Sequence, residues 1–269
     1  MAQANPFRFH KMHGLGNDFV VIDARVTPVA MDAARARAIA DRREGIGFDQ
    51  LVLIEPSDIA DAKIIFYNAD GSIAESCGNA SRCIAQFLGG ESRVETAGGM
   101  LTLKAEGEGA TVDMGAPRFD WDRIPLAYPV DTASLPVAWE ELASPAAVNV
   151  GNPHVIFFVP DTDAVPLDRL GPIIEHDALF PERVNVNVAT VEGPQRLRLR
   201  VWERGAGLTR ACGTGACATA VAAIRSGRVQ SPVTVQLPGG ELVIDWAPGG
   251  TIRMTGPATH VYEGEATGL

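Results

Sequence analysis

The second half of the chain reads Cys212-Gly213-Thr214-Gly215-Ala216-Cys217, and the first half reads Cys77-Gly78-Asn79-Ala80-Ser81-Arg82-Cys83. The leading cysteines of the two stretches are 135 residues apart (212 minus 77). The same offset relates Asn17 to Asn152 and Gln50 to Asn185 without a gap. Matched polar positions at one fixed offset indicate an internal duplication, in which each half presents an equivalent cysteine.

The order of the expected elements repeats as well. Each half is predicted to run strand, helix, strand, strand, cysteine helix and closing ribbon. The first half supplies 19–22, 31–43, 50–54, 64–67, 80–88 and the ribbon 98–103 with 111–114. The second half supplies 155–159, 167–176, 184–191, 197–202, 216–224 and the ribbon 239–244 with 251–254. This pattern predicts an α/β protein with two related lobes.

The lobes are predicted to span residues 1–118 and 119–256, and the tail 257–269 is a candidate to pack back on the first lobe. The proline-bearing segment from Pro117 to Pro145 is interpreted as the connection between the lobes. A length of 269 residues and an apolar content of 46% are sufficient for two small cores.

Composition limits the partners that the protein is expected to have. A net charge of −10, with no stretch rich in Lys and Arg, argues against nucleic acid or an anionic membrane as a main partner. Residues 1–10 lack the apolar core of a signal peptide, and the longest apolar run, 216–224, is too short to span a bilayer. We therefore expect a soluble cytoplasmic protein whose four cysteines are reduced thiols.

Cys77 and Cys212 each precede an Ala-rich segment that favours a helix. At a helix N-terminus the unpaired backbone N–H groups and the helix dipole favour an anion. The pKa of a thiol there can fall from about 8.5 to roughly 3.5–7.5, so each cysteine is expected to become a usable base near neutral pH. Two such cysteines flanking one α-carbon would remove a proton from one face and return one to the other, which inverts the centre.

Other interpretations of the cysteines stay open at this point. A buried free cysteine is more often a packing residue, and we assign that role to Cys83 and Cys217 because they lack a common offset. Neither pair has the spacing of structural zinc ligands, so no metal site is expected. Cys77 and Cys212 could instead form a reversible disulfide if their Cα atoms came within about 7 Å.

Seven motifs, in order along nearly the whole chain, closely resemble those of the diaminopimelate epimerase family. They are 11–19 (Lys11 to Phe19), 67–72 (Tyr67 to Ser72), Cys77-Gly78-Asn79, Gly151-Asn152-Pro153-His154, Arg183-Val184-Asn185-Val186, Glu203-Arg204-Gly205 and 211–217 (Ala211 to Cys217). The resemblance implies an epimerase without PLP or any other cofactor. Its substrate would be the small molecule diaminopimelate, interconverted between its LL- and meso-forms on the route to lysine and peptidoglycan.

The resemblance also implies the fold and the assembly. The fold would be α/β (α+β), with two pseudo-symmetric lobes around a central cleft. Each lobe would be a curved, mostly antiparallel sheet around a central helix headed by a cysteine. Homodimers are usual in the family, and we therefore expect one here.

The resemblance also implies which residues form the site, at the positions that match the family motifs. Cys77 and Cys212 would be the catalytic acid/base pair, and His154 and Glu203 would tune the thiols. The substrate-binding set would be Asn17, Gln50, Asn68, Gly78, Asn79, Asn152, Asn185, Glu203, Arg204, Gly213 and Thr214. Two positions depart from the family pattern, because Ala80 and Asn187 stand where the family usually has Gly.

Ordinary structural roles compete with several of these assignments. An Asn beside Gly is often a turn residue, Glu203 and Arg204 could be a solvated pair of charges, and His154 alone would favour a structural role. A PLP enzyme would need a lysine, and Lys11, Lys63 and Lys104 lie in no supporting motif. The alternative functions are a proline- or hydroxyproline-type racemase with the same thiol pair, and a redox-sensing dithiol protein.

Overall fold

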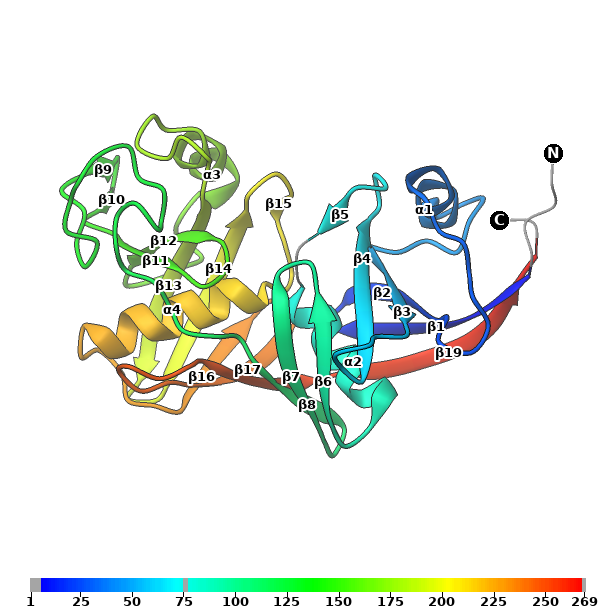
Figure 1. The fold of residues 1–269 in the computed structure, drawn as a ribbon. Coiled ribbons are helices and arrows are strands. Elements are labelled where there is room, and N and C mark those ends of the chain that lie inside the picture. Colours follow the sequence, from blue (N-terminus) through cyan, green and yellow to red (C-terminus); the bar gives the residue numbers. More distant parts are fainter. Residues whose placement is uncertain (1–5, 75–76, 268–269) are drawn as a thin grey trace. The chain divides into compact units, whose positions relative to one another are not determined.

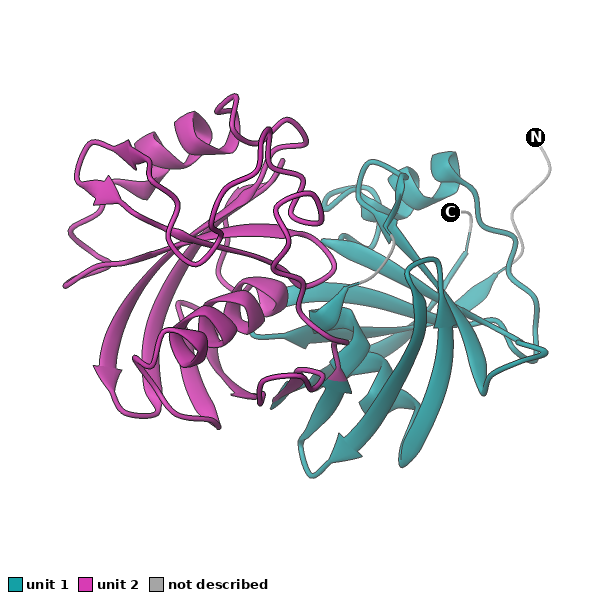
Figure 2. Ribbon diagram, turned by 60° about the vertical axis from the view of Figure 1, so that its left-hand side comes forward, with its two compact units in different colours: residues 1–112, 256–269 teal, residues 113–255 magenta. Residues whose placement is uncertain are grey.

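The computed structural model describes residues 6–74 and 77–267 (Figure 1). The chain divides into two compact units, residues 1–112 with 256–269 and residues 113–255 (Figure 2). The predicted boundary after residue 118 lies a few residues inside the second unit. The tail belongs to the first unit, where its strand pairs with the first strand of the chain.

The first unit is a sheet wrapped around one helix. Its strands are β1 (Phe7–Gly14), β2 (Asn17–Asp23), β3 (Gln50–Glu55), β4 (Ala62–Asn68), β5 (Ile73–Ala74), β6 (Glu91–Thr96), β7 (Gly99–Glu106), β8 (Gly109–Asp113) and β19 (Thr259–Ala266). Neighbours pair antiparallel except β2 with β3 and β4 with β6, which are parallel. Helix α2 (Gly78–Leu88) contacts β1, β2, β6 and β7, and α1 (Ala33–Ala40) packs on β3 and β4.

The second unit repeats this plan. Its strands are β9 (Ala138–Trp139), β10 (Leu142–Ala143), β11 (Ala146–Asn149), β12 (Pro153–Phe158), β13 (Asn185–Gly193), β14 (Arg196–Glu203), β15 (Gly207–Leu208), β16 (Val233–Leu237), β17 (Gly240–Asp245) and β18 (Arg253–Pro257). The pairs β12–β13 and β14–β16 are parallel. Helix α4 (Gly213–Arg225) contacts β11, β12, β13, β14, β16 and β17, and α3 (Leu167–Glu175) packs on β13 and β14.

The strand register confirms the duplication. In the first unit Phe19 of β2 lies opposite Gln50 of β3, and in the second His154 of β12 lies opposite Asn185 of β13. Both pairs are parallel, and both positions differ by 135 residues. The mixed α/β fold predicted from the sequence is therefore confirmed.

Each central helix begins where its cysteine sulfur can accept a backbone N–H. Cys77 and Cys212 are N-cap residues with extended backbone angles, φ −147° and φ −129°. Because the sulfur satisfies an otherwise unpaired amide, both helices start two or three residues earlier than alanine content alone predicts. The helix predicted over 31–43 is shorter, since Asp32 caps its start and Asp41 ends it in a turn.

Segment 117–145 corrects one prediction, because it is a packed part of the second unit. Ile124, Leu126, Leu135 and Leu142 are buried in the same apolar cluster as Phe157 of β12. Apolar side chains spaced between the prolines bury themselves on the sheet, so the interpretation of this segment as a connection was wrong.

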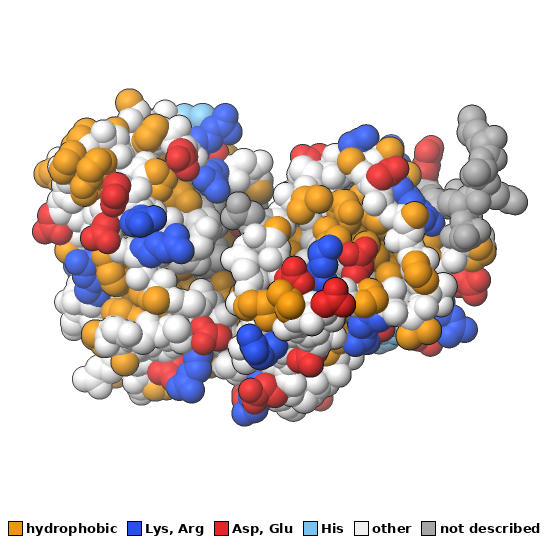
Figure 3. Space-filling view, viewed as in Figure 1, with side chains coloured by type: hydrophobic (Ala, Val, Ile, Leu, Met, Phe, Trp, Pro, Cys, Tyr) orange, Lys and Arg blue, Asp and Glu red, His pale blue; other side chains and the backbone are white. Residues whose placement is uncertain are grey.

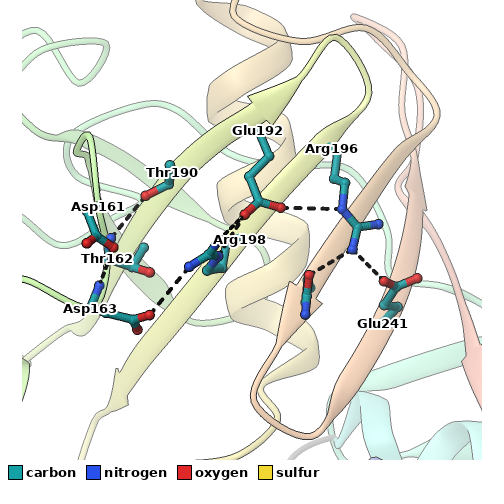
Figure 4. Close-up of polar contacts among 9 residues, drawn as sticks. Asp161, Thr162, Asp163, Thr190, Glu192, Arg196, Arg198 and Glu241 are labelled. Atoms are coloured by element: carbon teal, nitrogen blue, oxygen red, sulfur yellow. Dashed lines mark hydrogen bonds and ion pairs between the residues drawn. The ribbon is translucent and has the colours of Figure 1, made fainter.

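A network of charged side chains at the surface links neighbouring strands of the second unit. In Figure 4, Glu192 lies between Arg196 and Arg198, and Arg196 also reaches Glu241 across the strands at 2.6 Å. Exposed ion pairs of this kind contribute about 0–1 kcal/mol each. On the face drawn in Figure 3, acidic and basic side chains are interspersed. We therefore assign this network a role in strand register.

Candidate active site

Three of the predicted polar residues lie at one edge of the first sheet. Asn17 begins β2, Gln50 begins β3 and Asn68 ends β4. Gln50 lies opposite Asn68 in the antiparallel β3–β4 pair, and β2 runs parallel to β3. The first residues of β2 and β3 and the last residue of β4 therefore lie at the same edge. The structure thus brings these three predicted residues together.

Hydrogen bonds orient the amides of this edge. Asn79, near the start of α2, donates to Asn17 at 3.2 Å, and Gln50 donates to Asn68 at 2.8 Å. Asn17 in turn donates to the carboxylate of Asp49 at 2.8 Å. Asp49 was missed in the sequence, although it immediately precedes the predicted Gln50. These contacts give Asn17 a set orientation, which an ordinary turn residue would not need.

A cluster of charged side chains lies next to Asn17 at the same edge. The Asp18 carboxylate accepts from Lys11 at 2.5 Å and from Arg42 at 2.7 Å. Burial opposes ionisation of Asp18, but the hydrogen bonds from Arg42 and Lys11 outweigh it and lower its pKa to about 2. The ionised carboxylate is therefore part of the folded state.

This cluster predicts an acid-dependent loss of stability. The pKa of Asp18 is lowered from 3.8 to about 2, so its contribution is present above pH 3.8 and disappears as the pH falls through about 2. The difference corresponds to at most about 2 kcal/mol of unfolding free energy, and solvent screening of the exposed Arg42 side chain reduces it. In denaturant titrations, Asp18→Asn should therefore lose less stability than the parent between about pH 5 and pH 2.

The exposed Asp58 offers a control, and Asp58→Asn should follow the parent curve. Equal acid sensitivity of the parent protein and Asp18→Asn would contradict the assigned role of Asp18.

The second sheet repeats the arrangement at the equivalent edge. Asn152 directly precedes β12, and Asn185 begins β13. The Asn185 amide donates to the Pro153 carbonyl at 2.8 Å and accepts the backbone N–H of Arg204 at 2.9 Å. Asn185 thus joins β12 to the turn that carries Arg204.

Glu175 of α3 holds this turn from the other side and was missed in the sequence. It is 2% exposed, and its carboxylate accepts from the Trp202 indole at 2.7 Å and from the Gly205 N–H at 3.0 Å. Gly205 has φ +76°, a conformation that favours glycine. The only sequence signal was an acidic residue inside an apolar helix. Glu203 and Arg204 consequently belong to a turn that these bonds hold in place; Glu203 is half-buried, and Arg204 is exposed and donates to the Glu182 carbonyl at 3.0 Å.

The contacts beside the two cysteines are equivalent. The sulfur of Cys77 accepts the Ala80 N–H at 3.4 Å, and the sulfur of Cys212 accepts the Gly215 N–H at 3.3 Å. Asn152 donates to Thr214 at 3.3 Å, and at the equivalent positions of the first unit Asn79 donates to Asn17. The duplication therefore preserves the paired positions beside each thiol, with donor and acceptor exchanged.

The pKa expected for Cys212 is corrected by the structure. Burial raises the pKa of this thiol well above its ordinary value, and the nearby carboxylate of Glu203 raises it further. Hydrogen bonds from Thr214 and Gly215 act in the opposite direction but do not compensate. Cys212 is therefore a protonated thiol near neutral pH, whereas the helix N-terminus alone predicted a base. Cys77 is partly exposed.

His154 lies buried behind this edge. Burial lowers the pKa of its ring to about 3, so the imidazole is neutral. One ring nitrogen contacts Asn152 at 2.9 Å and the other contacts Asn187 at 3.1 Å. The structure thus connects His154 to Cys212 through Asn152 and Thr214. Its proposed influence on a thiol stays a prediction.

The other two thiols and the three lysines occupy packed or ion-paired positions. Cys83 and Cys217 are buried within their helices, and burial raises the pKa of Cys83 to about 12, which fits packing roles. The lysines form ion pairs, Lys11 with Asp18, Lys63 with Glu55 and Lys104 with Glu106. Among residues 6–74 and 77–267, no three His, Cys, Asp or Glu side chains are grouped to hold a metal. Across the same ranges, no helix is both long and apolar enough to cross a membrane.

Comparisons with known proteins agree with the resemblance in the sequence. A family model described as diaminopimelate epimerase matches residues 9–119 and 146–261. The chain is 67% identical to a diaminopimelate epimerase of Rhizorhabdus wittichii over 96% of this chain and 94% of the relative. It is 66% identical to one of Sphingopyxis alaskensis over 96% of each.

A solved structure shares the fold at low identity. It is a hydroxyproline epimerase from Agrobacterium vitis, with a TM-score of 0.70, 16% identity, and coverage of 99% of this chain and 92% of that one. An identity this low supports the fold alone, so it does not favour the racemase alternative.

Proposed function

Because the chain belongs to the diaminopimelate epimerase family, we propose that it interconverts LL- and meso-2,6-diaminopimelate without a cofactor. The enzyme is accordingly an isomerase that would serve lysine and peptidoglycan precursor synthesis. The single observation that carries the mechanism is the repeated cysteine N-cap, with an oriented amide beside each thiol.

We assign the resting protonation states from the surroundings of Cys212. Its raised pKa makes Cys212 the proton donor, so Cys77 would act as the thiolate base. Cys77 would take the α-proton from one face, and Cys212 would deliver its thiol proton to the opposite face of the carbanion. Cys212 is then the thiolate. When the other isomer reacts, Cys212 takes its α-proton and Cys77 delivers a proton, which restores the resting states. No proton is gained or lost overall.

The helix N-termini would stabilise the charge that develops during this transfer. Gly78 and Asn79 in one unit, and Gly213 and Thr214 in the other, place backbone N–H groups at the starts of α2 and α4. Such groups bind carboxylates and stabilise an enolate-like intermediate better than water does. The reacting carboxylate is therefore assigned to these residues.

The remaining amides and Arg204 are suited to the second amino-acid end of the substrate. Amide groups can accept from an ammonium and donate to a carboxylate, and a guanidinium pairs with a carboxylate through two parallel bonds. The bonded pair Gln50–Asn68 and the braced turn at Arg204 supply these groups already oriented. This second end distinguishes diaminopimelate from proline. A homodimeric state and a cytoplasmic location remain part of the proposal.

A substrate panel tests the function. The purified protein, in reductant and without PLP, should epimerise LL-diaminopimelate and leave L-proline, hydroxyproline and L-lysine unchanged. Turnover of proline would retain the two-thiol mechanism but replace the substrate. Absence of turnover on every substrate would overturn the proposal in favour of a redox or binding role.

A further inference from the structure

Asn187 is a buried amide in β13 that the mechanism above does not use. Its Nδ2 lies 3.1 Å from His154 Nδ1, 3.0 Å from the Val155 carbonyl and 3.3 Å from the Asn185 carbonyl. Carbonyl oxygens only accept, so the NH₂ group must be the end of the amide that faces them. The orientation of Asn187 is therefore fixed by two backbone carbonyls.

This orientation determines which nitrogen of His154 carries the proton. An amide nitrogen cannot accept a hydrogen bond, and Asn187 Nδ2 faces Nδ1 at 3.1 Å, so Nδ1 is the unprotonated nitrogen and the proton of the neutral ring lies on Nε2. Nε2 then donates to Asn152 Oδ1 at 2.9 Å. A carbonyl at Asn187 facing the ring would require the opposite tautomer.

The tautomer in turn sets the direction of the next hydrogen bonds. With Oδ1 held by His154, Asn152 presents its NH₂ group to the Thr214 hydroxyl at 3.3 Å. The Thr214 hydroxyl oxygen accepts there, so its own proton is available for the Cys212 sulfur at 3.6 Å. Donors and acceptors thus run in one direction from Asn187 to the sulfur.

We propose that Asn187 is a positioning residue that fixes the Nε2–H tautomer of His154 and thereby directs the Thr214 hydroxyl to the sulfur of Cys212. The catalytic consequence rests on the proposed function, in which Cys212 becomes a thiolate during each turnover. With the tautomer reversed, Asn152 would present its oxygen to Thr214. The hydroxyl proton would then be drawn to Asn152, and the thiolate would lose a donor.

Packing around Asn187 supports a specific use of its NH₂ group. Within residues 6–74 and 77–267, the Asn187 Oδ1 has no hydrogen-bond partner. A buried carbonyl without a partner is destabilising, and an apolar side chain would avoid that cost. A Cβ at Gly215 would lie 2.7 Å from this oxygen and 3.2 Å from the Cys212 sulfur. The space beside the thiol is therefore occupied by Asn187.

The ring nitrogens of His154 can be observed directly by ¹⁵N NMR of the full-length protein labelled at histidine. The protein has five histidines, and His154→Gln assigns the signals by their loss. At neutral pH we expect a protonated Nε2 and an unprotonated Nδ1. A ring protonated at Nδ1 would overturn the proposal without any substitution at position 187.

Asn187→Leu removes the donor while keeping a side chain in the space, and Asn187→Ala serves as a second variant if the larger side chain prevents folding. The His154 signals should then show both tautomers, and epimerisation should fall about tenfold, as expected for one lost hydrogen bond. Thr219→Val is the control, because Thr219 is another buried polar residue of the second unit. It should leave the ring signals and the rate unchanged.

The NMR and the rate separate this proposal from the proposed function. Unchanged ring signals in both Asn187 variants would overturn the positioning role, even if the rate fell. The expected ring signals in a parent protein that does not epimerise diaminopimelate would uphold the tautomer assignment and overturn the proposed function.

Discussion

Replacing either Cys77 or Cys212 by serine is expected to abolish epimerisation. Serine keeps an N-cap acceptor for the Ala80 or Gly215 N–H, so helix α2 or α4 should still form. A serine hydroxyl is, however, a much weaker acid than a thiol and cannot exchange the proton at neutral pH. Loss of one acid/base group should lower the rate by about 10⁴-fold. Steady-state epimerisation with both isomers, together with thermal unfolding, would measure this.

The two serine variants should differ in a diagnostic partial reaction. In Cys212→Ser, Cys77 can still remove the α-proton that faces it, so one isomer should exchange that proton with solvent slowly and without inversion. Cys77→Ser should show much less exchange with the other isomer near neutral pH, because Cys212 is protonated there. Cys83→Ser and Cys217→Ser are matched controls in the same two helices, and they should remain active. Near-normal epimerisation by Cys77→Ser or Cys212→Ser would contradict the two-base mechanism.

Removing the charge of Glu203 is expected to have the next largest effect. Burial and the Glu203 carboxylate raise the pKa of Cys212, so Glu203→Gln should lower that pKa and favour the thiolate. Cys212 must act as the base when the reaction runs in the opposite direction, and a thiolate of lower pKa is a weaker base. We therefore expect epimerisation to fall by about 10²-fold. Glutamine should retain the acceptor for the Thr209 hydroxyl, which lies 2.5 Å from the carboxylate.

The pKa change can be followed by the ultraviolet absorbance of the thiolate during a pH titration. A Cys77→Ser background keeps the signal of Cys77 out of the measurement. Addition of Glu203→Gln should shift the Cys212 titration to lower pH, whereas Glu192→Gln in the surface network should not. An unchanged Cys212 titration would show that Glu203 does not hold the thiol protonated.

The duplication and its cysteines made most of the fold predictable. A fixed offset located equivalent strands and helices in both halves, and the order of elements followed from apolar periodicity. The sequence could not show that sulfur caps α2 and α4, because the start of a helix depends on backbone geometry at Cys77 and Cys212. Segment 117–145 was misinterpreted because its prolines suggested a linker, whereas leucines such as Leu126 and Leu135 are buried.

The candidate site was predictable where its residues occupy motifs, and less so where burial changes their chemistry. Asn17, Gln50 and Asn68 meet because parallel and antiparallel pairing places their strand ends at one edge. The raised pKa of Cys212 was missed, since its burial and the nearness of Glu203 arise only on folding.

Supporting residues were harder to predict. Glu175 and Asp49 were missed because no spacing pattern marked them, and Asn187 was noted only as a departure from the family pattern. Each acts through hydrogen bonds to a neighbour: Glu175 on the Gly205 turn, Asp49 on Asn17 and Asn187 on His154.

The most direct test of two-base epimerisation is early-time deuterium incorporation from D₂O, with LL-diaminopimelate, reductant and no PLP. With separate groups removing and delivering protons, the meso product should carry deuterium at its inverted centre. Substrate recovered at the same time should carry almost none. Equal deuterium in product and recovered substrate would indicate a single base that serves both faces, and would contradict the paired roles of Cys77 and Cys212.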